Sequence, residues 1–238
     1  PYHARGDARR RACHPDRRRR IDLVDALRLP ALQSLDLSGV AVVDRPSCRF
    51  HIRYDEQHTV VGTDADYGAA ELLTSHALIQ AGHHDFVHVC CRRPLDAVPV
   101  LTALIGRGQP FSVDFVAASA AAMSAATANL LPHAQIIFAS VWEYALLSRT
   151  MDVSGLRAVA VTDGPRPVAL YRHGRHVAEV AVTQAEVVEV TGAGDTFTGT
   201  YLAATLRGEP QVRALHHATR AATARVATPG ITLHHTPP

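Results

Sequence analysis

Apolar residues recur along this chain in two alternating patterns. Short runs rich in Val, Ile and Phe are typical of buried strands, and apolar residues three or four positions apart are typical of helices that bury one face. From about residue 68 onward the two patterns take turns. They predict helices over 68–81, 95–106, 117–131, 141–149 and 210–226, and strands over 85–91, 110–114, 135–138, 157–162, 167–172 and 176–182. Such alternation predicts an α/β fold, with a mostly parallel sheet and helices on both faces.

The chain before residue 68 follows other patterns. Residues 48–54 and 58–62 alternate apolar and polar positions across an Asp55-Glu56-Gln57 turn, which predicts a hairpin exposed on one face. Residues 1–20 hold a dense arginine cluster without apolar periodicity and are predicted to be a disordered tail. An arginine tail can bind nucleic acid, but the lack of aromatic residues beyond Tyr2 favours an unstructured chain start. We expect residues 21–238 to form one α/β domain.

Composition removes several function classes. All 24 basic residues are arginines, and the formal net charge is +2. Without lysine there is neither a Walker-type phosphate loop nor lysine Schiff-base chemistry, and so small a net charge implies no strong preference for nucleic acid or membranes. The four cysteines form no Cys-x-x-Cys pair, so the spacing supports neither a zinc nor a redox motif. Neither a signal peptide nor a membrane-spanning run is recognisable, and we expect a cytoplasmic protein.

The most informative stretch is residues 187–207, which predict a strand, a tight glycine-rich turn and a helix. Val187, Val188 and Val190 would form the strand, and the helix would begin near Gly194. The first turn of a helix has backbone N–H groups without intrahelical partners, and the helix dipole is positive at that end. The predicted turn is therefore an anion site made by the amides of residues 193–195.

Asp195 is unexpected in such a place, because its carboxylate would compete with a bound anion. The conflict disappears if Asp195 faces a hydroxyl beside the anion. It would then accept the proton of a nucleophile while the amides hold a transferring phosphoryl group.

Two other interpretations of the turn are weighed. A dinucleotide-binding fingerprint is disfavoured because Phe197 occupies the third glycine position, and Leu215 and His216 stand where an acidic residue is expected. An ordinary strand-to-helix turn stays open, because short glycine motifs carry a real false-positive risk.

The run Gly192-Ala193-Gly194-Asp195, followed by Thr196-Phe197 and Gly199, resembles the second signature of the ribokinase-like (PfkB-type) carbohydrate kinases. The resemblance implies an ATP-dependent phosphotransferase acting on a sugar or sugar-like alcohol, with Mg2+. It implies that Asp195 is the catalytic base and that Gly192, Ala193 and Gly194 form the anion hole. Glu189 and Val190 stand where the family usually has Asp-Thr.

The resemblance implies further site residues at the carboxyl ends of predicted strands. Glu143, in the family's Asn-x-x-Glu position with Ser140 for the Asn, would support magnesium indirectly. Thr162 and Gly164 would lie near the nucleotide phosphates, and Thr219 near the adenine.

Structural interpretations stay open beside these roles. Glu143 can stabilise a helix dipole, and Asp163 and Gly164 suit a turn. Asp114 either caps a helix or matches the family's Asp-x-Asn-x-Arg element.

The family also implies a small β lid, here at about 40–62, through which a homodimer is possible. Expected partners are a small sugar and ATP, without nucleic acid or membrane. The family normally opens with one or two more βα units that hold the sugar, and none is recognisable before residue 21. We therefore expect a chain that lacks this unit and phosphorylates sugars poorly. The alternative hypothesis is a non-catalytic nucleotide-binding relative.

Overall fold

The computed structural model describes residues 25–28, 32, 35–54 and 60–229. The chain divides into two compact units, Pro1–Ala69 and Ala70–Pro238. The tail predicted at 1–20 lies outside the described residues.

The first unit contains the predicted hairpin. Strand β1 (Arg49–Tyr54) pairs antiparallel with β2 (Val60–Asp66), so two strands form on either side of the expected turn, whose residues lie outside the described ones. The Phe50 and Tyr67 rings meet edge to face at 6.3 Å between centroids. A short 3-10 helix, η2 (Asp25–Arg28), precedes the hairpin. Residues 40–48, which were expected to belong to the lid, contain no strand.

The second unit is built on a six-stranded sheet in the order β3-β4-β5-β6-β7-β8. Strands β3 to β6 are parallel, and β7 and β8 continue the sheet antiparallel. The strands are β3 (Val87–Cys91), β4 (Phe111–Phe115), β5 (Ile136–Ser140), β6 (Val159–Asp163), β7 (Arg166–Arg172) and β8 (Arg175–Val180). This confirms the predicted α/β class with a mostly parallel sheet.

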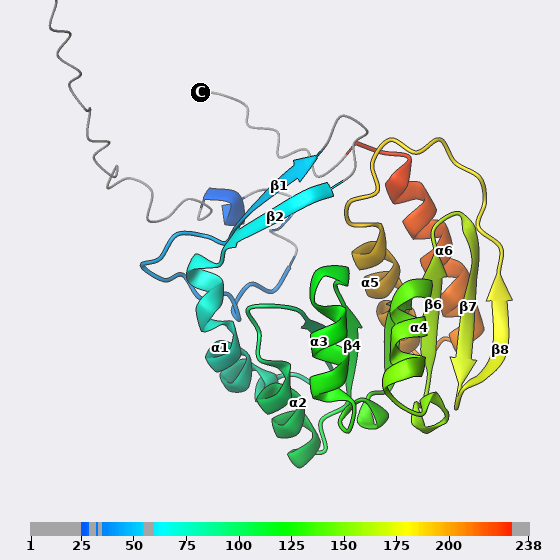
Figure 1. The fold of residues 1–238 in the computed structure, drawn as a ribbon, viewed down its shortest axis with the longest axis horizontal. Coiled ribbons are helices and arrows are strands. Elements are labelled where there is room, and N and C mark those ends of the chain that lie inside the picture. Colours follow the sequence, from blue (N-terminus) through cyan, green and yellow to red (C-terminus); the bar gives the residue numbers. More distant parts are fainter. Residues whose placement is uncertain (1–24, 29–31, 33–34, 55–59, 230–238) are drawn as a thin grey trace, which may run out of the picture. The chain divides into compact units, whose positions relative to one another are not determined.

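Helices cover both faces of this sheet (Figure 1). On one face lie α2, α3 and α4, and on the other lie α5 and α6. The α-helices are α1 (Leu73–Gln80), α2 (Ala97–Gly106), α3 (Ala117–Thr127), α4 (Val141–Thr150), α5 (Ala193–Leu206) and α6 (Gln211–Val226). Short 3-10 helices are η3 (Gly68–Leu72), η4 (Ala81–His83), η5 (Leu131–His133) and η6 (Val153–Gly155).

Strand β5 shows why two hydrophobic cores form. Because side chains alternate between the faces of a strand, Ile137 and Ala139 pack in the core under α2 to α4. Ile136 and Phe138 pack in the core under α5 and α6. A strand buried on both faces reads as a continuous apolar run, which is the pattern seen in the sequence.

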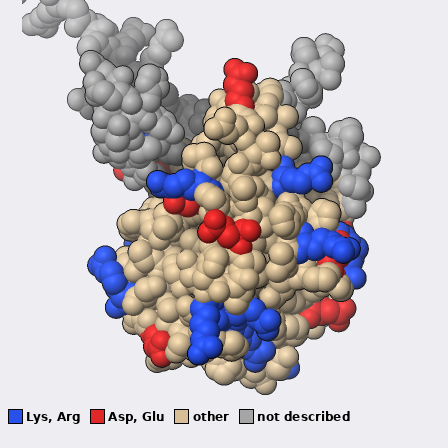
Figure 2. Space-filling model, turned by 90° about the vertical axis from the view of Figure 1, so that its right-hand side faces the viewer, with Lys and Arg blue, Asp and Glu red and all other residues tan. Residues whose placement is uncertain are grey.

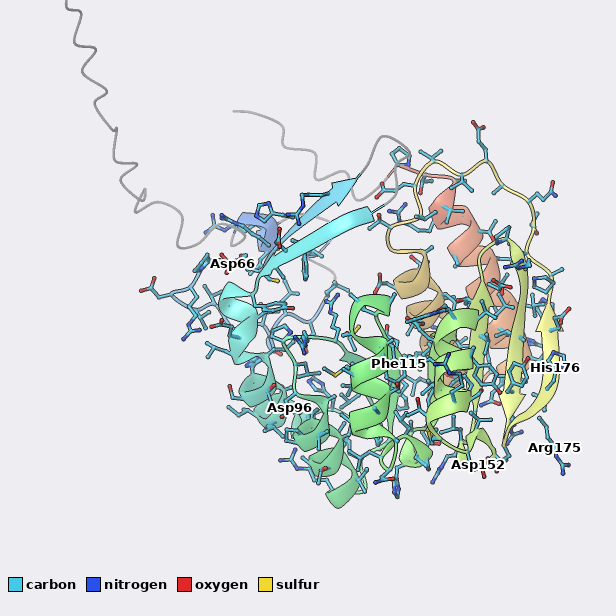
Figure 3. All side chains as sticks on the ribbon, viewed as in Figure 1. Asp66, Asp96, Phe115, Asp152, Arg175 and His176 are labelled. Atoms are coloured by element: carbon cyan, nitrogen blue, oxygen red, sulfur yellow. The ribbon has the colours of Figure 1, made fainter. Side chains whose placement is uncertain are left out.

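The surface carries both signs of charge. On the face turned to the viewer in Figure 2, arginine side chains and acidic side chains are interspersed with uncharged surface. Figure 3 shows the contrast between the sheet's interior and its edge, with Phe115 among packed side chains and Arg175 and His176 at the outer strand.

Asp96 caps α2 by accepting a hydrogen bond from the amide of Val98 at 3.3 Å.

The strand predicted at Val187 to Val190 is wrong. Residues 181–192 contain no strand, and these valines are exposed. The amides of Val188 and Glu189 both donate to the carbonyl of Val226 at the end of α6, at 2.8 and 3.1 Å. The amides therefore bond to a helix end instead of a neighbouring strand. High β-propensity does not by itself create a strand, because it reflects packing on a sheet that is absent at this point.

None of the described helices combines the length and the apolar character needed to cross a lipid bilayer.

An aromatic cluster joins α5 to the sheet. The Phe138 ring of β5 meets the Phe197 and Tyr201 rings edge to face, with centroids 6.2 and 5.4 Å away. Tyr201 is 1% exposed, and its hydroxyl has no hydrogen-bond partner among the described residues. The Tyr201 ring therefore stabilises the fold by packing, whereas its hydroxyl contributes no hydrogen bond.

We expect Tyr201→Phe to leave the free energy of unfolding unchanged or to raise it by about 1 kcal/mol, because it removes a buried unsatisfied hydroxyl and keeps the ring contacts. Tyr201→Ala should lower it by about 3–5 kcal/mol by leaving a cavity. Urea denaturation followed by circular dichroism measures both. A loss above about 1 kcal/mol in the Phe variant would mean that the hydroxyl has a partner.

Candidate active site

The glycine-rich turn begins α5 as predicted. Gly192 is the N-cap residue with φ of +81°, a left-handed conformation that glycine adopts readily. Its carbonyl accepts hydrogen bonds from the amide and the hydroxyl of Thr196, at 2.9 and 2.8 Å. The turn is therefore held in place by the first turn of its own helix.

Two backbone amides at this helix start are free to bind a ligand. In the described part of the chain, the amides of Gly194 and Asp195 have no backbone acceptor, and both residues are exposed. The amide of Ala193 was also expected to be free, but it donates to the carbonyl of Val190 at 3.1 Å. The anion site thus has one amide fewer than predicted, because the tight turn uses that amide for itself.

Asp195 lies in the first turn of α5 and is exposed. Its negative charge affects the pKa of Cys90, which lies near the end of β3. Burial raises the pKa of the Cys90 thiol to about 12, and the carboxylates of Asp114 and Asp195 add to that rise. The start of α5 is therefore within electrostatic reach of the carboxyl end of β3, and ligands of open α/β sheets bind at the carboxyl ends of strands.

Arg225, in the last turn of α6, is a residue that the sequence analysis missed. Its guanidinium lies 4.0 Å from the Glu189 carboxylate and donates to the carbonyl of Thr228 at 3.0 Å. A Cβ built on Gly192 would come within 3.5 Å of its Nε atom. This side chain, only 16% exposed, thus places a positive charge against the glycine turn. Only the folded chain brings α6 to the turn, so sequence spacing could not identify it.

A pocket of about 450 Å³ opens beside the turn. Its walls are mostly apolar and come from the β6–β7 hairpin, the segment before α5, the start of α5 and one side of α6. Five predicted site residues line it: Thr162, Gly164, Ala193, Gly194 and Thr219. Other lining residues include Val168, Val187, Phe197, Ala222 and Val226. Pockets of this size and character are typical of small-molecule and cofactor sites.

The predicted nucleotide-side residues lie along the pocket wall. Thr162 lies near the end of β6, and Gly164, with φ of +58°, opens the two-residue turn into β7. Asp163 forms a two-point ion pair with Arg166, at 2.6 and 2.9 Å. Thr219 is 4% exposed, and its hydroxyl donates to the carbonyl of Leu215 at 2.8 Å.

Glu143 does not line the pocket. Its carboxylate accepts a hydrogen bond from the amide of Ser140 at 2.7 Å, and the Ser140 hydroxyl accepts one from the amide of Glu143 at 3.3 Å. This reciprocal pair is a capping box at the start of α4. Glu143 therefore has a structural role at the start of α4, which occupies one of its carboxylate oxygens.

Comparisons with known proteins agree with the resemblance seen in the sequence. Among solved structures, a Burkholderia thailandensis nucleoside kinase in complex with inosine matches with a TM-score of 0.74 and 21% identity, over 88% of this chain and 72% of that one. A Schistosoma mansoni adenosine kinase in complex with 2-fluoroadenosine matches at 0.62 and 15%, over 79% and 64%. A Thermotoga maritima ribokinase matches at 0.60 and 17%, over 79% and 66%.

These likenesses show a shared fold, and the chain spans about two thirds of the length of those structures. A search of curated proteins found no significant match. The family model described as pfkB family carbohydrate kinase matches residues 45–237, which is most of the chain. The chain therefore belongs to the pfkB family of carbohydrate kinases.

Proposed function

We propose that this chain is an ATP-dependent phosphotransferase that acts on an alcohol group of a sugar or nucleoside. The observation that carries the proposal is the juxtaposition at the start of α5. Gly194 lines an apolar pocket, and its backbone amide and that of Asp195 are free. The same residue, Asp195, has an exposed carboxylate.

The pocket suits a nucleobase, because its walls are apolar and its volume is adequate. Phosphates extending from it would meet the two free amides and the positive end of the α5 dipole. The guanidinium of Arg225 adds a positive charge on the same side of the turn. In this arrangement the protein stabilises the charge of the transferring phosphoryl group through groups that are already in position.

Asp195 would act on the acceptor. Its carboxylate takes the proton of the acceptor hydroxyl as the hydroxyl oxygen bonds to the γ-phosphorus and the bond to the ADP oxygen breaks. Mg2+, which usually binds through one or two carboxylates together with substrate phosphates, would neutralise phosphate charge when bound with ATP. The second oxygen of Glu143 is the carboxylate group that would support the ion indirectly.

The matched structures guide the choice of acceptors to assay. One was solved with inosine and one with 2-fluoroadenosine, and a third is a ribokinase. A ribose ring is common to these compounds, so ribose and ribonucleosides are the first acceptors to assay.

A non-catalytic nucleotide-binding role is the second candidate. Glu189 replaces the family's usual Asp near the turn and lies 4.0 Å from Arg225, and the amide of Ala193 is not free. These departures weaken the phosphate side of the site while leaving the pocket intact. ATP binding without turnover of any acceptor would favour this candidate over the kinase.

Replacing the proposed base tests the chemistry. We expect Asp195→Asn to lower kcat by at least about 100-fold while ATP affinity stays within about twofold, because the amide keeps the shape but cannot accept the proton. The measurement is a coupled ADP-release assay with ribose and ribonucleosides. Asp85→Asn, which changes an exposed loop carboxylate, is the control and should be fully active. An Asn variant at position 195 as fast as the wild type would remove the base assignment.

The anion site is tested with a matched pair of glycines in α5. A Cβ at Gly194 or at Gly199 would meet no atom within 4 Å, so both valine variants should fold. Only Gly194→Val places its side chain beside the free amides. We expect it to weaken ATP binding about tenfold or more, the equivalent of one hydrogen bond to a charged group. Calorimetric titration in which Gly199→Val loses as much affinity would contradict the site.

The pocket is tested with a matched pair on α6. Ala222 lines the pocket, whereas Ala224 is exposed and does not. Ala222→Phe fills the space proposed for the base and should weaken ATP binding by about tenfold or more, while Ala224→Phe should leave it unchanged. Fluorescence titration with a nucleotide analogue checks both, and thermal unfolding confirms that both variants are folded. Equal affinities would place the nucleotide elsewhere.

A further inference from the structure

A polar cluster lies on β3 and β4, apart from the pocket. His88 pairs in register with Ser112, and Cys90 pairs with Asp114. These four residues alternate along their strands with Val89, Cys91 and Val113, which belong to the core under α2 to α4. They therefore lie on the opposite face of the sheet, the one that carries Phe138.

Polar residues are unusual there. On β5 to β8 the same face is an apolar core beneath α5 and α6. On β3 and β4 it carries an imidazole, a thiol, a hydroxyl and a carboxylate. The Oδ1 atom of Asp114 is buried without a hydrogen-bond partner among the described residues. A buried carboxylate oxygen left without a partner costs free energy, and a bound cation would offset that cost.

The geometry suits a metal ion. One ligand atom from each of His88, Cys90 and Asp114 can be chosen so that all lie within 4.8 Å of one another. His88 Nε2 is 3.6 Å from Asp114 Oδ2, which is too long for a hydrogen bond. Two ligand atoms bound to one tetrahedral zinc ion at about 2.0–2.1 Å stand roughly 3.3 Å apart, so a small movement would seat the ion.

The histidine is already oriented as a ligand. Its Nδ1 lies 2.9 Å from the hydroxyl of Ser112, which is fully buried, and its ring meets the Phe138 ring edge to face at 5.9 Å. With the proton on Nδ1, donated to Ser112, the lone pair of Nε2 points to Asp114. Metal-binding histidines are commonly held in this way, with the second ring nitrogen hydrogen-bonded.

We propose that His88, Cys90 and Asp114 bind one divalent transition-metal ion of the zinc class, with a fourth position open to solvent. His88 and Asp114 side chains are 27% and 18% exposed, so an ion can reach the site. Thiolate and imidazole ligands favour Zn2+ and Co2+ over Mg2+. The proposal does not depend on the kinase reaction.

The Asp114 carboxylate, one of the three proposed ligands, supplies negative charge that a bound cation would balance. Binding replaces the proton of the Cys90 thiol with the metal: the S–H bond breaks, the S–metal bond forms, and the proton leaves to solvent.

The experiment is a Co2+ titration of the whole chain without nucleotide. We expect one equivalent to bind, with thiolate-to-cobalt charge-transfer absorption and the intense visible bands of tetrahedral cobalt. Cys90→Ser should abolish the charge-transfer band, and His88→Gln should weaken binding at least about tenfold. Cys48→Ser and His84→Gln change residues outside the cluster and should behave like the wild type.

A second measurement separates binding from folding. Zn2+ should raise the Tm of the wild type but not that of Cys90→Ser, and excess Mg2+ should not displace it. Ser112→Ala keeps all three ligands and should weaken binding by about tenfold through the freed imidazole. Wild-type chain that shows no cobalt spectrum and dialyses free of Zn2+ would overturn the proposal, whatever the variants do. So would a charge-transfer band that survives Cys90→Ser.

Discussion

The edge-to-face packing of Phe138 on Phe197 and Tyr201 holds the site together. A 14-residue helix is marginally stable alone in water, and most of its stability in a protein comes from packing. These rings fix α5 on the sheet. Because Phe197 is two residues from Asp195, the same contacts determine where the free amides and the carboxylate lie. The candidate chemistry therefore depends on a hydrophobic contact, and one of its rings, Phe197, also lines the pocket.

Helices α5 and α6, which cover the same face of the sheet, contribute residues of different size. On α5 the large rings fill the core. On α6 the small residues Ala214 and Ala218 let the helix approach the core, and Thr219 and Ala222 leave the space that becomes the pocket. Arg225 then ends α6 at the glycine turn, with Glu189 as its partner. Part of the pocket wall and one positive charge thus come from a helix that the signature motif does not include.

Local patterns predicted the fold well because each strand and helix carries its own periodicity. They failed where tertiary contacts decide the outcome. Val187 to Val190 have strand propensity, but their amides bond to the end of α6. The resemblance drew attention to Asp195 and the turn, because their motif is contiguous and can be recognised in the sequence alone. Helix packing brings Arg225 to the turn, and strand register brings the His88 cluster together. A single sequence does not reveal which helices pack together or which strands pair.

The pocket walls have a further consequence for the order in which the molecule is assembled. Apart from Thr162 near the end of β6, its lining residues follow the parallel strands in the chain, from Gly164 to Val226. During synthesis the earlier part of a chain emerges first and can begin to fold. The pocket lacks a wall until α6 has left the ribosome, so no ligand in it can assist the strands that precede it. Strands β3 to β6 must therefore find their register through their own hydrophobic packing. Nucleotide in this pocket can stabilise the fold only after α6 has packed.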